Sequence, residues 1–160
     1  MKTNLTKLWT NHIQAKNAWD RLPTNENTIK MLSTYGIYKC YGGRRELNIR
    51  NRAFTTDKAA KMAKQKYEYY IDGIIDLTKV LEIFINSECK ESEKHTSIEY
   101  LHNKYGCSKD IMFKNRDNIQ LEYVMHKIAD RITERTKDRE AFNIVEMTKI
   151  IWMNTCKVER

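Results

Sequence analysis

The sequence predicts a mainly α-helical fold, a helical bundle of about six helices with one long central helix and one small β-hairpin near residues 37–49, α+β at most. Apolar residues recur at steps of three and four along most of the chain, which is the spacing of one face of an α-helix. A single proline and five glycines leave little material for the turns of a sheet-rich fold. The 160 residues are enough for a domain that buries its own core.

Two helices are expected before the hairpin. Apolar residues at helical spacing run from about Asn4 to Leu22, and Pro23 ends this helix because proline lacks a backbone N–H and clashes with the preceding turn. A short helix should follow around residues 25–33, with Gly36 as its stop.

The hairpin is predicted from two stretches with strand-like composition. Residues 37–41 and 44–49 flank the dipeptide Gly42-Gly43. Two adjacent glycines accept the positive φ angles of a two-residue hairpin turn, so the dipeptide is the expected turn.

A long helix should begin near Thr56 or Asp57. Its apolar residues keep a heptad spacing. They are Ala60, Ala63, Tyr67, Tyr70, Ile74, Leu77, Leu81 and Phe84. The pair Asp72-Gly73 would also fit a hairpin turn, but the seam continues in register through Gly73, which costs a helix only about 1 kcal/mol. We therefore expect one uninterrupted helix.

The same apolar seam is a candidate self-association surface. Two copies of the chain would meet along it in a homodimer. The residues of this contact would be Tyr70, Ile74, Leu77, Leu81 and Phe84. The alternative, which the sequence leaves open, is that the seam packs inside one bundle.

Three further helices are expected in the second half of the chain. A capping box at residues 96–99 should open a helix that Gly106 ends. A second start signal at residues 117–120 precedes an amphipathic helix. The last helix should begin near Asp138 and is apolar around most of its circumference, which is typical of a helix central to the core or covered by a second subunit.

Positive charge is confined to the first half of the chain. The formal net charge is +8; residues 1–80 hold 15 Lys and Arg against 7 Asp and Glu, whereas residues 81–160 hold 14 of each. With a polar stretch at residues 90–95, this predicts a basic part over 1–89 and a neutral part over 96–160, together in one compact unit. One-sided positive charge is typical of a protein that binds DNA or RNA, although it also fits a solvated face.

The candidate nucleic-acid-binding residues lie on the predicted hairpin and the first turns of the long helix. Arginine makes two-point contacts to phosphate, and tyrosine rings stack on bases. The set is Lys39, Arg44, Arg45, Arg50, Arg52, Lys58, Lys61, Lys64, Tyr38 and Tyr41. The two tyrosines could equally belong to the core. A second candidate is a helix-turn-helix over residues 98–119, in a region without net positive charge.

The sequence thus predicts a small non-enzymatic nucleic-acid-binding protein, a regulator or accessory factor in the cytoplasm. No GxxxxGK[ST], HExxH or GxSxG motif is present. No metal or cofactor is expected, because Cys89, His95, His102 and Cys107 match no zinc-finger spacing. Lys, Ile, Asn and Tyr make up 58 of the 160 residues, a bias compatible with a phage, a virus or a mobile element.

Two other functions stay open. The first is a non-enzymatic, anti-CRISPR-like inhibitor of a host nucleic-acid or defence system, which would dock on an acidic protein surface or on a nucleoprotein complex. The second is a metal-dependent nuclease that uses Glu68, Asp72 and Asp76, since their four-residue spacing places three carboxylates on one helical face. The lysines interleaved with these carboxylates favour a solvated helix surface instead.

Overall fold

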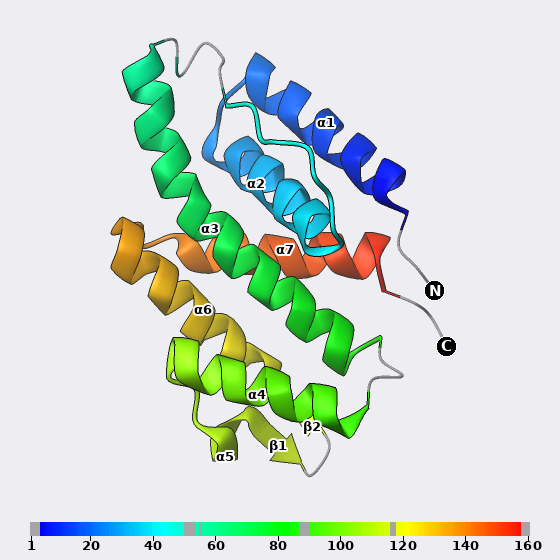
Figure 1. Cartoon of the computed structure of the whole chain (residues 1–160). Helices are drawn as coiled ribbons and strands as arrows, with labels where there is room; N and C mark the ends of the chain where they lie inside the picture. Colours follow the sequence, from blue (N-terminus) through cyan, green and yellow to red (C-terminus); the bar gives the residue numbers. More distant parts are fainter. Residues whose placement is uncertain (1–3, 50–53, 55, 87–89, 116–117, 158–160) are drawn as a thin grey trace.

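The computed structural model describes residues 4–49, 54, 56–86, 90–115 and 118–157. Within these residues the chain is mainly helical, as predicted, with one pair of short antiparallel strands (Figure 1). The helices are α1 (Leu5–Arg21), α2 (Asn25–Cys40), α3 (Asp57–Phe84), α4 (Glu91–Tyr105), α5 (Lys109–Met112), α6 (Leu121–Thr136) and α7 (Ala141–Thr155). The strands are β1 (Phe113–Asn115) and β2 (Asn118–Ile119). No helix in the described part of the chain is long and apolar enough to span a lipid bilayer.

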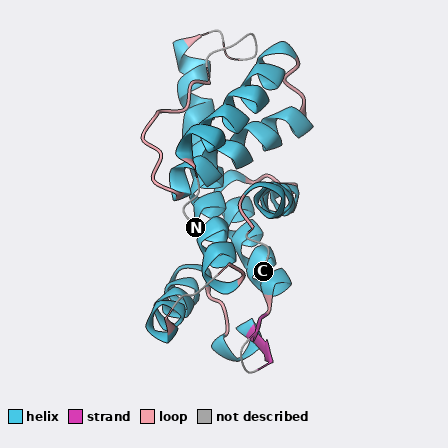
Figure 2. Ribbon diagram, turned by 90° about the vertical axis from the view of Figure 1, so that its right-hand side faces the viewer, coloured by secondary structure: helices cyan, strands magenta, loops and turns pink. Residues whose placement is uncertain are grey.

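The long helix α3 organises the molecule. Helices α2, α4, α6 and α7 all pack against it, and α1 packs on α2. Helix α7 also contacts α2 and α6, so the last helix of the chain packs against elements from both halves of the sequence. Figure 2 shows the resulting elongated shape, with α1 and α2 at one end and α4 and the strands at the other.

The apolar seam of α3 packs inside a single copy of the chain. Tyr70 is 2% exposed, and Ile74, Leu77 and Leu81 have no exposed surface. Phe84 is half-buried and packs against the same core. Each fully buried aliphatic side chain contributes about 1.5–3 kcal/mol to folding. These five residues therefore form the intramolecular core, and a homodimer through this seam is not supported.

The predicted hairpin at residues 37–49 is wrong. Residues 37–40 form the last turn of α2, and Gly42–Ile49 contains no strand. The Gly42 N–H donates to the Lys39 carbonyl at 3.1 Å, and the Gly43 N–H donates to the Tyr38 carbonyl at 3.0 Å. This pair of bonds, with φ +96° at Gly42, is the Schellman arrangement that ends a helix. The glycine pair serves a helix end instead of a hairpin turn.

Gly36 does not stop α2; it brings α2 close to α3. A Cβ atom at this position would lie 2.3 Å from Cγ2 of Ile74, which is far inside a normal contact. The absence of a side chain therefore allows the two helices to pack directly, and α2 continues to Cys40. The sequence alone does not distinguish a glycine at a contact between two helices from a glycine that ends a helix.

The second half of the chain follows the prediction with shifted boundaries. Helix α4 begins at Glu91 instead of residue 96, and Gly106 ends it in the left-handed conformation, as expected. The chain then forms α5 and the β1–β2 pair, in which Phe113 is opposite Ile119. This small hairpin was not predicted, because its two strands are only three and two residues long.

Candidate nucleic-acid interface

Three of the predicted binding residues form a row of exposed lysines at the start of α3. Thr56 caps the helix, because its Oγ1 accepts a hydrogen bond from the Ala59 N–H at 3.1 Å. Lys58, Lys61 and Lys64 follow at three-residue spacing and are all exposed. None of them forms an ion pair with a carboxylate of the described residues. The helix N-terminus adds the partial positive charge of its free N–H groups.

Arg44 and Arg45 lie in the extended segment that follows α2. Both are exposed. The Arg45 guanidinium lies over the ring of Trp9 on α1, with Cζ 5.2 Å from the ring centroid. Lys39 is half-buried in the last turn of α2. The two remaining arginines of the predicted set lie outside the described residues; they are Arg50 and Arg52.

The extended segment separates the arginines from the lysines. Arg45 lies beside Trp9, whereas Phe54 packs against Trp19, with ring centroids 5.9 Å apart. Trp9 and Trp19 are ten residues apart on α1, which corresponds to about 15 Å of helix. Phe54 also contacts Tyr67 of α3, at 6.2 Å between ring centroids. The two groups of cations therefore occupy opposite ends of the α1–α2 pair (Figure 1).

Tyr38 and Tyr41 are structural residues rather than stacking platforms. Tyr38 is 5% exposed, and its hydroxyl accepts hydrogen bonds from the backbone N–H groups of residues 44–45, each at 3.1 Å. The Tyr41 hydroxyl donates to Glu82 at 2.6 Å and accepts from the indole N–H of Trp152 at 2.8 Å. Burial and the bond to Glu82 raise the pKa of Tyr41. Tyr38 is thus part of the core, and the half-buried Tyr41 packs against it.

The second half of α3 carries a carboxylate, Asp76, whose burial the sequence does not predict. Asp76 is 3% exposed. Its Oδ1 accepts a hydrogen bond from Tyr100 at 3.0 Å, and its Oδ2 accepts from Lys104 at 2.8 Å and from Tyr105. The Lys104 ammonium also lies 2.7 Å from Oδ2 of Asp72. Lys104 thus lies between the two carboxylates, where a divalent cation shared by them would have to bind.

The environment fixes the protonation states in this cluster. Burial, together with the negative charge of Asp76, raises the pKa of Tyr105 and of Tyr100. Burial alone would lower the pKa of Lys104, but its hydrogen bonds to Asp72 and Asp76 outweigh this and raise it. At neutral pH the tyrosines therefore act as hydroxyl donors and Lys104 is charged. Besides the four-residue spacing of Asp72 and Asp76, the sequence signal of this site is the four-residue and one-residue spacing of Tyr100, Lys104 and Tyr105 on α4.

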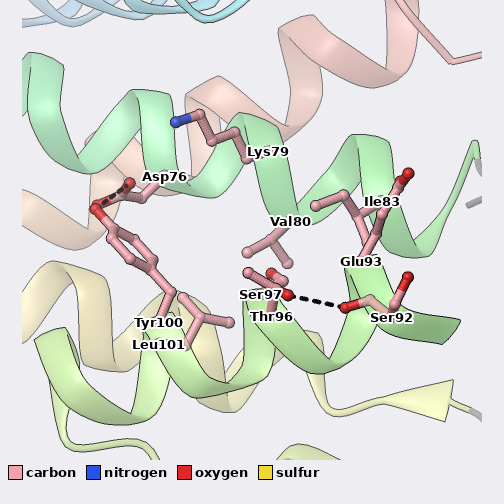
Figure 3. A pocket seen from close by; sticks show the side chains of 10 residues that line it. All are labelled: Asp76, Lys79, Val80, Ile83, Ser92, Glu93, Thr96, Ser97, Tyr100 and Leu101. Carbon is pink, nitrogen blue, oxygen red and sulfur yellow. Dashed lines mark hydrogen bonds between the residues drawn. The ribbon is translucent and has the colours of Figure 1, made fainter. Parts of the chain in front are cut away.

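The first of two cavities beside this cluster is mainly apolar and lies between α3 and α4 (Figure 3). Its volume is about 410 Å³. Val80, Ile83 and Leu101 supply its apolar walls. In Figure 3 the hydrogen-bonded pair of Asp76 and Tyr100 closes one end. We call this cavity the apolar cavity.

The second cavity is polar and is lined by α3, α4 and α6. Its volume is about 440 Å³. We call it the polar cavity; the residues used below are Glu68, Tyr69, Asp72, Asn103, Arg131 and Arg135. Neither Arg131 nor Arg135 is among the nucleic-acid-binding residues predicted from the sequence. Their spacing of four residues on the amphipathic helix α6 is the signal that could have paired them.

Two further predictions concern a helix-turn-helix and a group of possible zinc ligands. The helix-turn-helix over residues 98–119 is not formed, because α4 is followed by a helix of only four residues and then by β1. Across the described residues, no group of three or more His, Cys, Asp or Glu side chains is placed to hold a metal ion. Cys89, one of the four residues considered for zinc, lies outside the described residues.

Comparison with protein-family models, with curated proteins and with solved structures finds no match to this chain. The function is therefore argued from the geometry of the molecule itself.

Proposed function

We propose that this chain is a nucleic-acid-binding protein, a regulator or accessory factor that binds the phosphate backbone of DNA or RNA inside the cell. The observation that carries the proposal is the row of exposed, unpaired cations at Lys58, Lys61 and Lys64 in the described part of α3. Arg44 and Arg45 supply a second point of contact at the other end of the α1–α2 pair.

The charge distribution supports a polyanionic partner over a small anion. Arg45 lies over Trp9, whereas Phe54, which precedes the lysine row, packs on Trp19, about 15 Å further along α1. Duplex DNA carries one negative charge per roughly 1.7 Å of axis, so a single backbone can meet both groups at once. A phosphate ion or a mononucleotide would reach only one of them.

Binding as a function of salt concentration tests the proposal. Fluorescence anisotropy of labelled 20-residue DNA and RNA, single-stranded and duplex, is measured from 50 to 200 mM NaCl. For duplex DNA the slope of log K against log salt should be about −0.9 for each phosphate contacted. Replacing Lys58, Lys61 and Lys64 together by Gln should reduce this slope by roughly three contacts and weaken binding to every sequence alike.

The matched control removes the same charge elsewhere. Lys90, Lys109 and Lys157 are exposed lysines of the neutral half, and their replacement by Gln also lowers the net charge by three. This variant should keep the wild-type slope. Equal losses in the two variants would mean that only total charge matters, and binding without salt dependence would contradict the proposal. Surface replacements of this kind change stability by less than about 0.5 kcal/mol each, so both variants fold.

A second candidate function, a non-enzymatic inhibitor that binds a host protein, is favoured by the apolar cavity. Val80, Ile83 and Leu101 offer an apolar pocket to a side chain of a partner. Pull-down from nuclease-treated lysate separates the two functions. A stoichiometric protein partner that survives nuclease and is lost in Ile83→Asp, a replacement of a half-buried lining residue, favours the inhibitor. Retention of nucleic acid alone favours the first proposal.

A further inference from the structure

The polar cavity opens on the same side of α3 as the lysine row. Lys58, Lys61, Glu68 and Asp72 follow one another at steps that are close to multiples of a helical turn, so they share one side of the helix. Lys61 and Glu68 are seven residues apart, which is about 10 Å along the axis. A nucleic-acid strand whose phosphates contact these lysines would therefore extend to the polar cavity.

The cavity has a cationic rim of its own. Arg131 and Arg135 from α6 and Lys104 from α4 contribute to its lining. Arg131 is held in place because its guanidinium donates to the backbone carbonyl of Lys104. Lys104 is shared between Asp72 and Asp76, and with the two arginines it supplies three positive charges against the three carboxylates Glu68, Asp72 and Asp76. The acidic lining residues consequently do not make the cavity repulsive to a polyanion.

An aromatic platform stands at the cavity. Tyr69 is 43% exposed. The Arg135 guanidinium lies over the ring, with Cζ 5.7 Å from the centroid. Tyrosine rings and arginine planes are the two protein surfaces on which unpaired bases stack. Tyr69 is therefore the candidate ring for stacking on a base, in place of Tyr38 and Tyr41, which the sequence suggests for that role.

Hydrogen-bonding groups for the edge of a base line the same cavity. Asn103 is exposed and offers an amide donor and acceptor, and Glu68 and Asp72 offer carboxylate acceptors. Amides and carboxylates are the groups that read base edges. The Watson–Crick edge is free to meet them only when the base is unpaired.

We propose that the polar cavity receives one unpaired base of a single-stranded nucleic acid, stacked at Tyr69 while the neighbouring phosphates lie on Lys58 and Lys61. The inference rests on the proposed function and narrows its ligand to single strands. The cavity volume of about 440 Å³ is within the usual range of small-molecule sites, roughly 300–1,000 Å³, and is large enough for a base.

The test uses 15-residue oligonucleotides with a central 2-aminopurine, as single-stranded DNA, single-stranded RNA and duplex DNA. The wild-type chain should bind a single strand more tightly than the duplex and quench the 2-aminopurine fluorescence. Tyr69→Ala should weaken single-strand binding by about 5-fold to 150-fold, the range expected for loss of one stacking ring, and should abolish the quenching. Tyr69→Phe keeps the ring and should behave like the wild type. The DNA and RNA arms show which sugar is preferred.

The outcomes separate the inference from the function on which it rests. If no oligonucleotide binds with salt dependence, the proposed function fails. If binding is lost in the Lys58, Lys61, Lys64 variant but Tyr69→Ala binds and quenches like the wild type, the cavity is not a base site and only the inference is overturned. Duplex binding as tight as single-strand binding overturns it as well. The thermal unfolding curve of Tyr69→Ala verifies that this exposed replacement leaves the fold intact.

Discussion

Two regions of the molecule meet along α3, and each combines surface charges with a buried titratable side chain. In the first region, which comprises α1, α2 and the first turns of α3, the lysines at the start of α3 form no ion pair among the described residues, and His12 is buried. In the second region, which comprises α4, α6 and the second half of α3, the cation Lys104 is paired and the buried group is the carboxylate Asp76. The two regions thus distribute charge in opposite ways.

This difference arises because α4 covers one stretch of α3. Lys58 and Asp76 lie on the same side of the helix, because their separation of eighteen residues equals five full turns. Helix α4 packs against α3 near Asp76, whereas Lys58 in the first turn of α3 is exposed. A charge under α4 must find partners, since an unpaired buried charge is costly, whereas an uncovered charge stays available to a ligand. One side of α3 thus carries a paired, buried carboxylate at one end and exposed, unpaired lysines at the other.

Removing the buried carboxylate should have the largest effect. Asp76→Ala leaves Tyr100, Lys104 and Tyr105 without their acceptor, so we expect a loss of about 3–5 kcal/mol in the free energy of unfolding by urea. The control Asp72→Ala removes an exposed partner of the same Lys104 and should cost less than about 1 kcal/mol. Equal losses in both variants would contradict the account of Asp76 as the centre of the cluster.

The buried group of the first region should respond to acid. His12 is 1% exposed, its Nδ1 lies 3.3 Å from Oγ1 of Thr34, and burial lowers its pKa from 6.5 to about 4. Below pH 6.5 the unfolded chain takes up a proton that the folded chain does not, so the free energy of unfolding should fall as the pH decreases from 6.5 to 4, by about 3 kcal/mol in all.

The variant His12→Gln isolates this contribution. The difference between the wild-type and variant urea curves should be independent of pH above 6.5 and should change only between pH 6.5 and 4. A difference that stays constant across that range would show that His12 titrates normally in the folded protein.

Two glycines, one facing each region, should respond differently to alanine. Gly36→Ala places a Cβ 2.3 Å from the branched Cγ2 of Ile74, so α2 and α3 must separate, and we expect a loss of about 2 kcal/mol. Gly73→Ala meets the flexible Cδ1 of Ile132 at 2.8 Å and gains up to about 1 kcal/mol of helix propensity, so its net change should stay within about 1 kcal/mol. Thermal unfolding measures the change in stability of each variant. A smaller loss of stability in Gly36→Ala than in Gly73→Ala would contradict the close packing of α2 on α3.

Local patterns predict the helical elements well and their contacts poorly. The boundaries of α1 and α3 agree with the sequence because Asn4 and Thr56 are capping residues next to clear apolar periodicity. The Gly42-Gly43 pair fits a hairpin turn and a Schellman helix end equally well, because both need a positive φ at glycine; in the structure Gly42 and Gly43 close the end of α2 through their hydrogen bonds to Lys39 and Tyr38.

The candidate site was predictable only where it depends on exposure and charge. The lysine row can be predicted, because Lys58, Lys61 and Lys64 are spaced by three residues in the first turns of α3. The polar cavity cannot be predicted in this way, because it joins Tyr69 to Arg131 and Arg135 across more than sixty positions of sequence. Asp76 was assigned to a solvated surface for a similar reason, since no local pattern shows that Tyr105 will cover it.

Chemical footprinting of lysines tests the central claim most directly. The chain is acetylated with an amine-specific reagent, with and without a saturating 15-residue single-stranded DNA or RNA, and the modification of each lysine is measured by mass spectrometry. The account predicts that the oligonucleotide protects Lys58, Lys61 and Lys64, while Lys90 and Lys157 react at unchanged rates. Protection confined to Lys90 and Lys157, or equal protection of all five, would contradict it.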